Sequence, residues 1–196
     1  MIRVKLKNIN KRYRTKEVLQ NVFFEFHNGL YLLCGENGIG KSTLLKIIIG
    51  FSFPTYGEVE VNGKICYTPD KMILPNFLTV DEVLQSLKEY YKSKVEINYL
   101  YDTFNYGEYK NYRLKNISKG TYQKLILSIF LLNKSEIYLF DEPLNGLDFD
   151  TCNTFMSLLR ELLEDNKLVI ISSHLPDLYL ELNPIILRIE SGKIKW

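Results

Sequence analysis

Two periodicities of apolar residues divide the chain. Apolar and basic side chains alternate from Ile2 to Lys7, which predicts a strand with one buried face and one charged face. Short continuous apolar runs then predict buried strands at Tyr31–Cys34, Ile137–Phe140 and Leu168–Ile171. Because segments with helical spacing separate these runs, the pattern predicts an α/β fold with a mostly parallel sheet.

An antiparallel β element is predicted near the N-terminus. A second strand around Val18–Phe26 follows the polar segment Asn8–Lys16. Further along, Asn62-Gly63 separates the strand-like stretches Glu58–Val61 and Lys64–Tyr67, a spacing typical of a two-residue hairpin. We therefore expect these two stretches to form antiparallel strands that pair with each other.

A helical lobe is predicted inside what we treat as a single domain, residues 1–196. Thr79 and Glu82 have the spacing of a capping box, and the apolar period changes there from that of a strand to that of a helix. A weaker helical stretch covers Val95–Phe104, and a third helix starts near Ser118. The sequence thus predicts a core of residues 1–70 and 134–196 with an inserted lobe at about 71–133.

Composition and charge narrow the function classes. The 25 basic and 23 acidic side chains give a net charge of +2, so we expect no nucleic-acid partner. The 3 cysteines lack a C-x-x-C spacing, which argues against a disulfide framework and favours a reducing compartment. No apolar run approaches the roughly 20 residues of a membrane span, so any membrane role is expected to be that of a peripheral subunit.

The segment Gly35–Thr43 fits the spacing G-x-x-x-x-G-K-S/T between a predicted strand and a predicted helix. In such a loop, backbone N–H groups curve around a polyphosphate and the helix N-terminus adds its positive dipole end. Lys41 is expected to neutralise the outer phosphates, and Ser42 to offer its hydroxyl to Mg²⁺. The nucleotide contacts predicted in this loop are Gly35, Asn37, Gly38, Gly40, Lys41, Ser42 and Thr43.

Two carboxylates follow the apolar run Ile137–Phe140. A carboxylate at the end of a buried strand is costly unless it faces a cation or a polar cleft. In a phosphate-loop fold this strand end lies beside the nucleotide, so we expect Asp141 to hold Mg²⁺ and Glu142 to act as the catalytic base on the attacking water. Two solvated acids at a strand end are the alternative interpretation.

Four segments, taken in order, resemble the motifs of the ATP-binding cassette (ABC) ATPases: Gly35–Thr43, Ile117–Leu125, Leu144–Asp148 and Ser172–His174. The resemblance covers essentially the whole chain and implies a P-loop nucleotide hydrolase that uses ATP and Mg²⁺. It implies that Tyr13 stacks on adenine, and that His174 senses the γ-phosphate as a catalytic residue beside Lys41. Ser118 and Gly120 would reach the ATP bound by a second ABC subunit in a homodimer or pseudo-dimer.

Departures from the ABC pattern leave some roles open. Family members often carry a glutamine where this chain has Asp70, and a carboxylate there can still bind the metal but adds negative charge beside ATP. In the signature stretch, Lys119 and Thr121 replace the commoner glycine and glutamine. For Tyr13, an ordinary loop aromatic is the alternative interpretation.

The combined interpretation is an Mg²⁺-dependent ATPase subunit that powers an ABC transporter through ATP-driven dimerisation. It would couple to a separate membrane-spanning permease subunit, and would be cytoplasmic and peripheral on the inner face of the cell membrane. The alternative is a non-transport ABC ATPase acting on the ribosome or nucleic acid, although such proteins usually carry two cassettes or long coiled-coil insertions. Ser118 and His174 argue against a phosphate-loop kinase or GTPase, and Glu142 argues against a binding module with a dead site.

Overall fold

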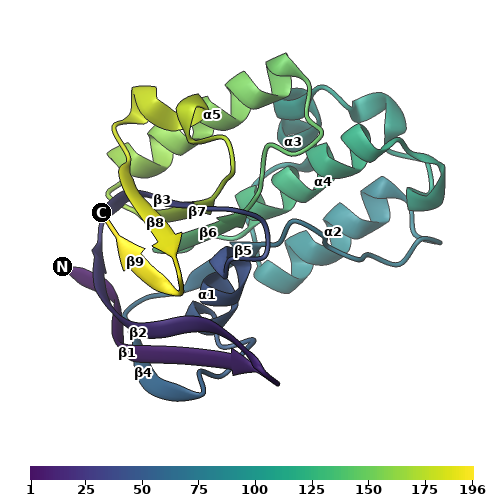
Figure 1. Cartoon of the computed structure of the whole chain (residues 1–196). Coiled ribbons are helices and arrows are strands. Elements are labelled where there is room, and N and C mark those ends of the chain that lie inside the picture. The colour runs from purple at the N-terminus through teal and green to yellow at the C-terminus, as the bar shows by residue number, and fades with distance from the viewer. The chain divides into compact units, whose positions relative to one another are not determined.

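The chain groups into two compact units in a computed structural model that describes residues 1–196 (Figure 1). Unit 1 comprises Met1–Tyr67, Ser135–Pro143 and Leu159–Trp196. Unit 2 comprises Thr68–Lys134 and Leu144–Leu158. The domain bounds expected from the sequence, a core with a lobe inserted at about 71–133, stay a prediction.

A three-stranded antiparallel sheet in unit 1 has the strand order β2-β1-β4. Its strands are β1 (Ile2–Tyr13), β2 (Lys16–His27) and β4 (Tyr56–Val61). The expectation of a polar connecting segment at Asn8–Lys16 is wrong, because β1 continues through most of it and pairs with β2 up to Tyr13↔Lys16. Register shifts interrupt this pairing, and Asn8 and Asn21 take left-handed backbone conformations with φ of 54° and 47°. Such β-bulges let the two long strands continue their hydrogen-bonded pairing past an unpaired residue.

The larger sheet has six strands in the order β5-β6-β7-β3-β8-β9. Strands β6, β7, β3 and β8 run parallel, which confirms the mostly parallel α/β fold, and β9 pairs antiparallel with β8. Every residue of β6 and β7 is buried, as expected for strands covered on both faces. The bounds are β3 (Gly29–Cys34), β5 (Ile65–Thr68), β6 (Ile137–Asp141), β7 (Leu168–Ser172), β8 (Ile185–Glu190) and β9 (Lys193–Lys195).

The hairpin predicted around Asn62-Gly63 is wrong, because β4 and β5 belong to different sheets. The Asn62 N–H donates to Arg3 O at 2.8 Å and so prolongs the pairing of β4 with β1. Two residues later, Lys64 O accepts from the N–H groups of Glu136 and Ile137, at 3.2 and 3.1 Å. Asn62-Gly63 therefore carries the chain from one sheet to the other, and distant strands set the pairing of both neighbours.

Helix α1 (Lys41–Ile48) lies between the two sheets of unit 1 (Figure 1). It packs with both sheets in one hydrophobic core. Its apolar residues pack in one cluster with side chains of β1 and β2, such as Val4, and of the larger sheet, such as Leu33. Leu44 and Leu45 are fully buried. The start of this helix is thereby fixed beside the ends of the central strands.

Unit 2 is mainly helical. Its helices are α2 (Val80–Tyr91), α3 (Ile97–Phe104) and α4 (Lys119–Leu132), with 3₁₀ turns at Gly107–Tyr109 and Leu114–Asn116. The predicted capping box is confirmed: Glu82 N–H donates to Thr79 Oγ1 at 3.2 Å, and Thr79 N–H donates to Glu82 Oε2 at 2.7 Å. Helix α5 (Phe149–Glu164) has residues in both units, and a 3₁₀ segment, Pro176–Leu182, belongs to unit 1. No helix is both long enough and apolar enough to cross a membrane.

Candidate functional site

The carboxyl ends of three neighbouring strands meet at one edge of the larger sheet. In the parallel register, Ser172 of β7 lies opposite Asp141 of β6 and opposite Leu33 of β3. The loop after β3 therefore starts beside the last residues of β6 and β7. In open α/β sheets this edge is where ligands bind.

The glycine-rich loop between β3 and α1 has a backbone that only glycine adopts easily. Gly35, Gly38 and Gly40 have φ of 145°, 76° and 128°. A Cβ at Gly40 would also lie 2.9 Å from Val18 Cγ1 and 3.2 Å from the Val18 carbonyl oxygen. Both constraints select glycine at this position, and they shape a loop that ends at the N-terminus of α1. Asn37 is exposed in the loop, and Thr43 lies in the first turn of α1.

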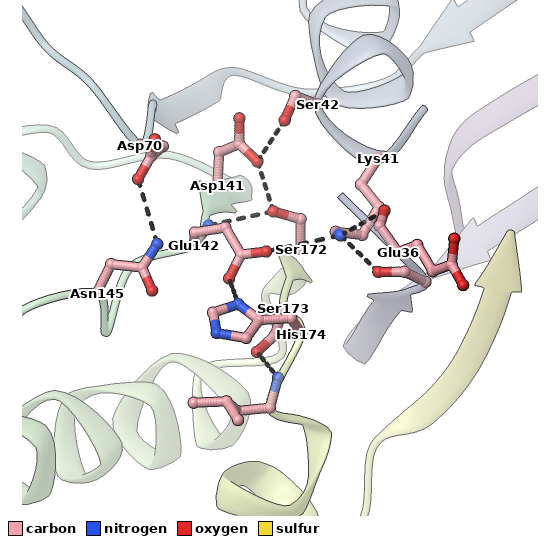
Figure 2. A network of polar contacts seen from close by, with 12 residues as sticks. Glu36, Lys41, Ser42, Asp70, Asp141, Glu142, Asn145, Ser172, Ser173 and His174 are labelled. Atoms are coloured by element: carbon pink, nitrogen blue, oxygen red, sulfur yellow. Dashed lines mark hydrogen bonds and ion pairs between the residues drawn. The ribbon is translucent and has the colours of Figure 1, made fainter. Parts of the chain in front are cut away.

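Lys41 lies folded back across this loop with only 6% of its surface exposed (Figure 2). Its ammonium donates to Gly35 O at 2.7 Å and to Glu36 O at 3.3 Å. It also lies 3.7 Å from Glu142 Oε1. A buried ammonium needs such oxygen partners, and phosphate oxygens would satisfy the same requirement.

Asp141 is 4% exposed and is held by hydroxyl groups. Its Oδ1 accepts from Ser42 Oγ at 2.9 Å and from Ser172 Oγ at 2.5 Å (Figure 2). The Tyr67 hydroxyl reaches Oδ2 at 3.5 Å. The structure thus brings together the two predicted metal ligands Ser42 and Asp141. The sequence reasoning missed the roles of Ser172 and Tyr67, although a serine at the end of a buried central strand was the available signal.

Glu142 has a left-handed backbone, with φ of 51°. Consecutive side chains of an extended strand point to opposite faces, so an ordinary continuation of β6 would send this carboxylate away from Asp141. The left-handed turn brings both carboxylates to the same edge. Two acceptors hold it, because the Glu142 N–H lies 3.1 Å from both the Ser172 carbonyl oxygen and Ser172 Oγ. Such strain persists only where the surroundings enforce it, and it is common at active sites.

The two oxygens of the Glu142 carboxylate have different surroundings. Its Oε2 lies 2.7 Å from His174 Nδ1, whereas Oε1 is buried and has no hydrogen-bond partner (Figure 2). The only cation near Oε1 is the Lys41 ammonium described above. One carboxylate oxygen is therefore oriented by an imidazole while the other keeps its lone pairs available. The structure brings together Lys41, Ser42, Asp141, Glu142 and His174, and their roles with nucleotide stay predictions.

Tyr13 ends β1 and is 46% exposed. Its hydroxyl lies 3.5 Å from Ser52 Oγ, in the segment that follows α1. This hydrogen bond is the main cause that lowers the pKa of the Tyr13 phenol, despite partial burial. The ring is thus a partly open aromatic surface on unit 1, and its stacking role stays a prediction.

The signature stretch of unit 2 begins α4. Ser118 caps this helix, since its hydroxyl accepts from the Thr121 N–H at 3.1 Å. Gly120 faces the loop that precedes α5, because a Cβ there would lie 3.8 Å from the Gly146 carbonyl oxygen. The Lys119 side chain also packs against this loop, because its Cε would lie 3.6 Å from a Cβ placed on Gly146.

The loop before α5 is tied to α4 by an ion pair between Lys124 and Asp148, with Nζ to Oδ2 at 3.1 Å. Asp148 Oδ1 also accepts from the Thr151 N–H at 2.8 Å. The hydrogen bonds with Thr151, followed by the one with Lys124, lower the pKa of Asp148 to about 2.

Asp70 also lies in unit 2, where its Oδ1 accepts from Asn145 Nδ2 at 3.3 Å (Figure 2). This bond links the segment after β5 to the loop before α5. The expected role of Asp70 as a metal ligand stays a prediction. No group of three or more His, Cys, Asp or Glu side chains forms an all-protein metal site in the chain.

Known proteins that are similar to this chain include ATP-binding proteins of ABC transporters. Residues 19–145 match the family model described as ABC transporter. An uncharacterized ABC transporter ATP-binding protein of Methanocaldococcus jannaschii is 32% identical over 197 residues, covering 97% of this chain and 75% of the relative. The zinc import ATP-binding protein ZnuC of Wigglesworthia glossinidia brevipalpis is 31% identical over 163 residues, covering 81% of this chain and 70% of the relative.

Solved structures extend the likeness to the fold. A dimeric ATP-binding cassette in a post-hydrolysis state, bound to ADP and Pi, superimposes with a TM-score of 0.85 and is 26% identical, covering 98% of this chain and 97% of that one. The ATP-binding subunit of an ABC transporter has a TM-score of 0.86 at 23% identity, covering 99% of this chain and 88% of that one. The chain therefore belongs to the ABC transporter family, as one of its ATP-binding and ATP-hydrolysing proteins.

Proposed function

We propose that this chain is the ATPase subunit of a membrane transporter and that Glu142 is its catalytic base. The observation that carries the proposal is the asymmetry of the Glu142 carboxylate, in which Oε2 is held by His174, whereas the buried Oε1 accepts no hydrogen bond and has only the Lys41 ammonium at 3.7 Å. A general base must keep a lone pair available for the proton that it removes, while its own position is fixed. Oε1 meets the first requirement and Oε2 meets the second.

Lys41 and the loop Gly35–Gly40 bind the phosphates in this proposal. The lysine ammonium, now satisfied by two carbonyl oxygens and a carboxylate, exchanges these partners for phosphate oxygens. The N–H groups of the glycine-rich loop and the positive end of α1 add to the same attraction. Tyr13 supplies the aromatic face on which adenine stacks.

The residues Ser42 and Asp141 fit a magnesium ion. Their oxygens lie 2.9 Å apart, and Asp141 is buried with hydroxyl groups around it. Mg²⁺ takes only one or two protein oxygens beside phosphates and waters, which agrees with the lack of an all-protein metal cluster. When bound, the ion would neutralise charge on the phosphates. Asp70 is a further proposed ligand on the family pattern alone.

His174 orients Glu142 and reports on the terminal phosphate in this scheme. Its Nδ1 lies on the Glu142 carboxylate, and its side chain is 44% exposed. A neutral imidazole donates from only one ring nitrogen. If Nδ1 donates to Glu142, then Nε2 can donate to a phosphate oxygen only when the ring is protonated. Otherwise the bond to Glu142 has to break first.

We further propose that two ABC subunits close on ATP, as a homodimer or a pseudo-dimer, and act on a membrane-spanning permease. Ser118 is exposed at the start of α4, which suits a contact with nucleotide held by a second subunit. A related cassette of 26% identity has been solved as a dimer with ADP and Pi. The protein then works at the inner face of the cell membrane through its partner.

Replacing Glu142 tests the proposal. Glu142→Gln keeps the size of the side chain but removes the base, so turnover should fall about 10²- to 10⁴-fold while ATP still binds. A stalled dimer should accumulate with ATP and Mg²⁺, measured by size-exclusion chromatography with light scattering. Glu164→Gln, an exposed change of the same kind at the end of α5, is the control and should turn over ATP normally. Wild-type turnover by Glu142→Gln would remove Glu142 from the role of base.

A further inference from the structure

One face of the Tyr13 ring is covered by a lysine. The Lys11 ammonium lies 4.8 Å from the ring centroid, within the range of a cation–π contact. Lys11 and Tyr13 are two residues apart on β1, so their side chains leave the same face of that strand. A base that stacks on this tyrosine must use the opposite face of the ring.

The lysine is held in place from a second side. Its Nζ donates to the Phe53 carbonyl oxygen at 2.6 Å, in the segment that follows α1. Backbone bonds join the same two parts of the chain, because the Thr55 N–H donates to Asn10 O at 2.8 Å and the Arg12 N–H donates to Thr55 Oγ1 at 3.0 Å. The ammonium is therefore fixed over the ring by a segment that is itself fixed to β1.

The Tyr13 hydroxyl is held by that segment as well, through Ser52 at 3.5 Å. The ring thus has contacts at its hydroxyl end and on one face, while 46% of the residue remains exposed. The nearby positive charge of Lys11 also contributes to the lowered pKa of the phenol, after the hydrogen bonds with Ser52 and Thr43. These contacts restrain the ring, while nearly half of the residue stays accessible to a ligand.

We propose that Lys11 is a positioning residue for the nucleotide base: it backs the Tyr13 ring and holds its free face toward the adenine. This inference rests on the proposed role of Tyr13 in ATP binding. A ring already fixed in its bound orientation loses less conformational entropy when the base stacks on it. Lys11 acts through the tyrosine and contributes nothing to a ligand that has phosphates but no base.

The size of the effect follows from the exposure of the pair. A cation–π contact at an exposed site changes an affinity about two- to fivefold. Lys11→Met keeps an unbranched side chain of similar length and removes the charge, so the dissociation constant of ATP should rise by about that factor. Lys11→Arg keeps a cation that can lie over the ring, so it should bind ATP as tightly as the wild type does.

Calorimetric titration of the full chain with ATP and with inorganic triphosphate, both with Mg²⁺ at one fixed salt concentration, separates a base effect from a charge effect. Lys11→Met should weaken ATP and leave triphosphate unchanged. In a Tyr13→Leu background, Lys11→Met should have no further effect on ATP, because the ring through which it acts is gone. Lys5→Met, which removes a cation of the same strand that is paired with Glu25 at 2.5 Å, is the charge control and should match the wild type.

Equal weakening of ATP and triphosphate would overturn the inference and make Lys11 a phosphate-attracting charge. The same holds for a Lys11→Met effect that persists without the Tyr13 ring, or for no effect on ATP at all. If the wild-type chain binds triphosphate but not ATP, or neither, the proposed function fails and the inference fails with it. If the wild type binds both and Lys11→Met equals it, only the inference fails.

Discussion

Ser172 holds the Asp141 carboxylate and the Glu142 backbone of the proposed ATPase site, so its hydroxyl should matter more than that of an ordinary buried serine. Ser172 is fully buried, and its Oγ lies 2.5 Å from Asp141 Oδ1 and 3.1 Å from the Glu142 backbone nitrogen. Ser172→Ala removes this oxygen without changing the strand. Asp141 Oδ1 still has Ser42, and the Glu142 N–H still has the Ser172 carbonyl oxygen.

The cost can be bounded from these partners. A hydrogen bond to a charged group contributes about 1.5–3 kcal/mol, and the upper end applies when a buried group is left without a partner. Since neither group is orphaned, we expect a loss of about 1.5 kcal/mol in the free energy of unfolding. For a chain of this length that corresponds to a melting temperature lower by about 3–6 °C.

The same change should affect turnover. Ser172 Oγ is one of two acceptors that hold the left-handed Glu142 backbone, so its loss lets the carboxylate leave its position. If about 1.5 kcal/mol of that restraint is lost, kcat falls up to about tenfold. Calorimetry of the nucleotide-free protein and steady-state ATPase assays measure the two effects. Ser157→Ala, an exposed serine of α5, is the matched control. A Ser172→Ala protein with the melting temperature and kcat of the wild type would refute this account of Ser172.

Two further predictions concern unit 2. The pKa of Asp148 is lowered from 3.8 to about 2 by Thr151 and Lys124, so its stabilisation is present above about pH 4 and is lost as the pH falls toward 2. Because the side chain is 57% exposed, this contribution to the free energy of unfolding is about 1 kcal/mol or less. Asp148→Asn retains a capping side chain and should make the free energy of urea unfolding less dependent on pH in this range. An unchanged pH dependence would contradict the assignment. If Asp70 faces the metal beside Asp141 and Glu142, the three carboxylates repel each other unless a cation lies between them. Asp70→Gln removes one of these charges and should make ATPase activity depend less steeply on the Mg²⁺ concentration. An identical Mg²⁺ titration would restrict Asp70 to its bond with Asn145.

The sequence alone identified the family and predicted the chemistry of the phosphate loop. Gly35–Thr43 is a contiguous motif whose glycine and lysine positions follow from local backbone geometry, so it can be interpreted without knowing which strands are neighbours. The buried apolar runs likewise predicted the parallel strands β3, β6 and β7, because their hydrophobicity is a local property. Asp141 and Glu142 were found from their place after such a run.

The tertiary structure decided the features that depend on distant partners. The sequences of β4 and β5 have the spacing of a two-residue hairpin, yet β4 pairs with β1 and β5 belongs to the larger sheet. The spacing alone does not determine which strands pair. The left-handed turn at Glu142 is possible because Ser172, 30 residues away, accepts its N–H. Lys11 lies over the Tyr13 ring because its ammonium donates a hydrogen bond to the carbonyl oxygen of Phe53, 42 residues away. Such contacts form only when chain closure brings remote segments together, and their hydrogen bonds and ion pairs then fix conformations that local preferences alone would not select.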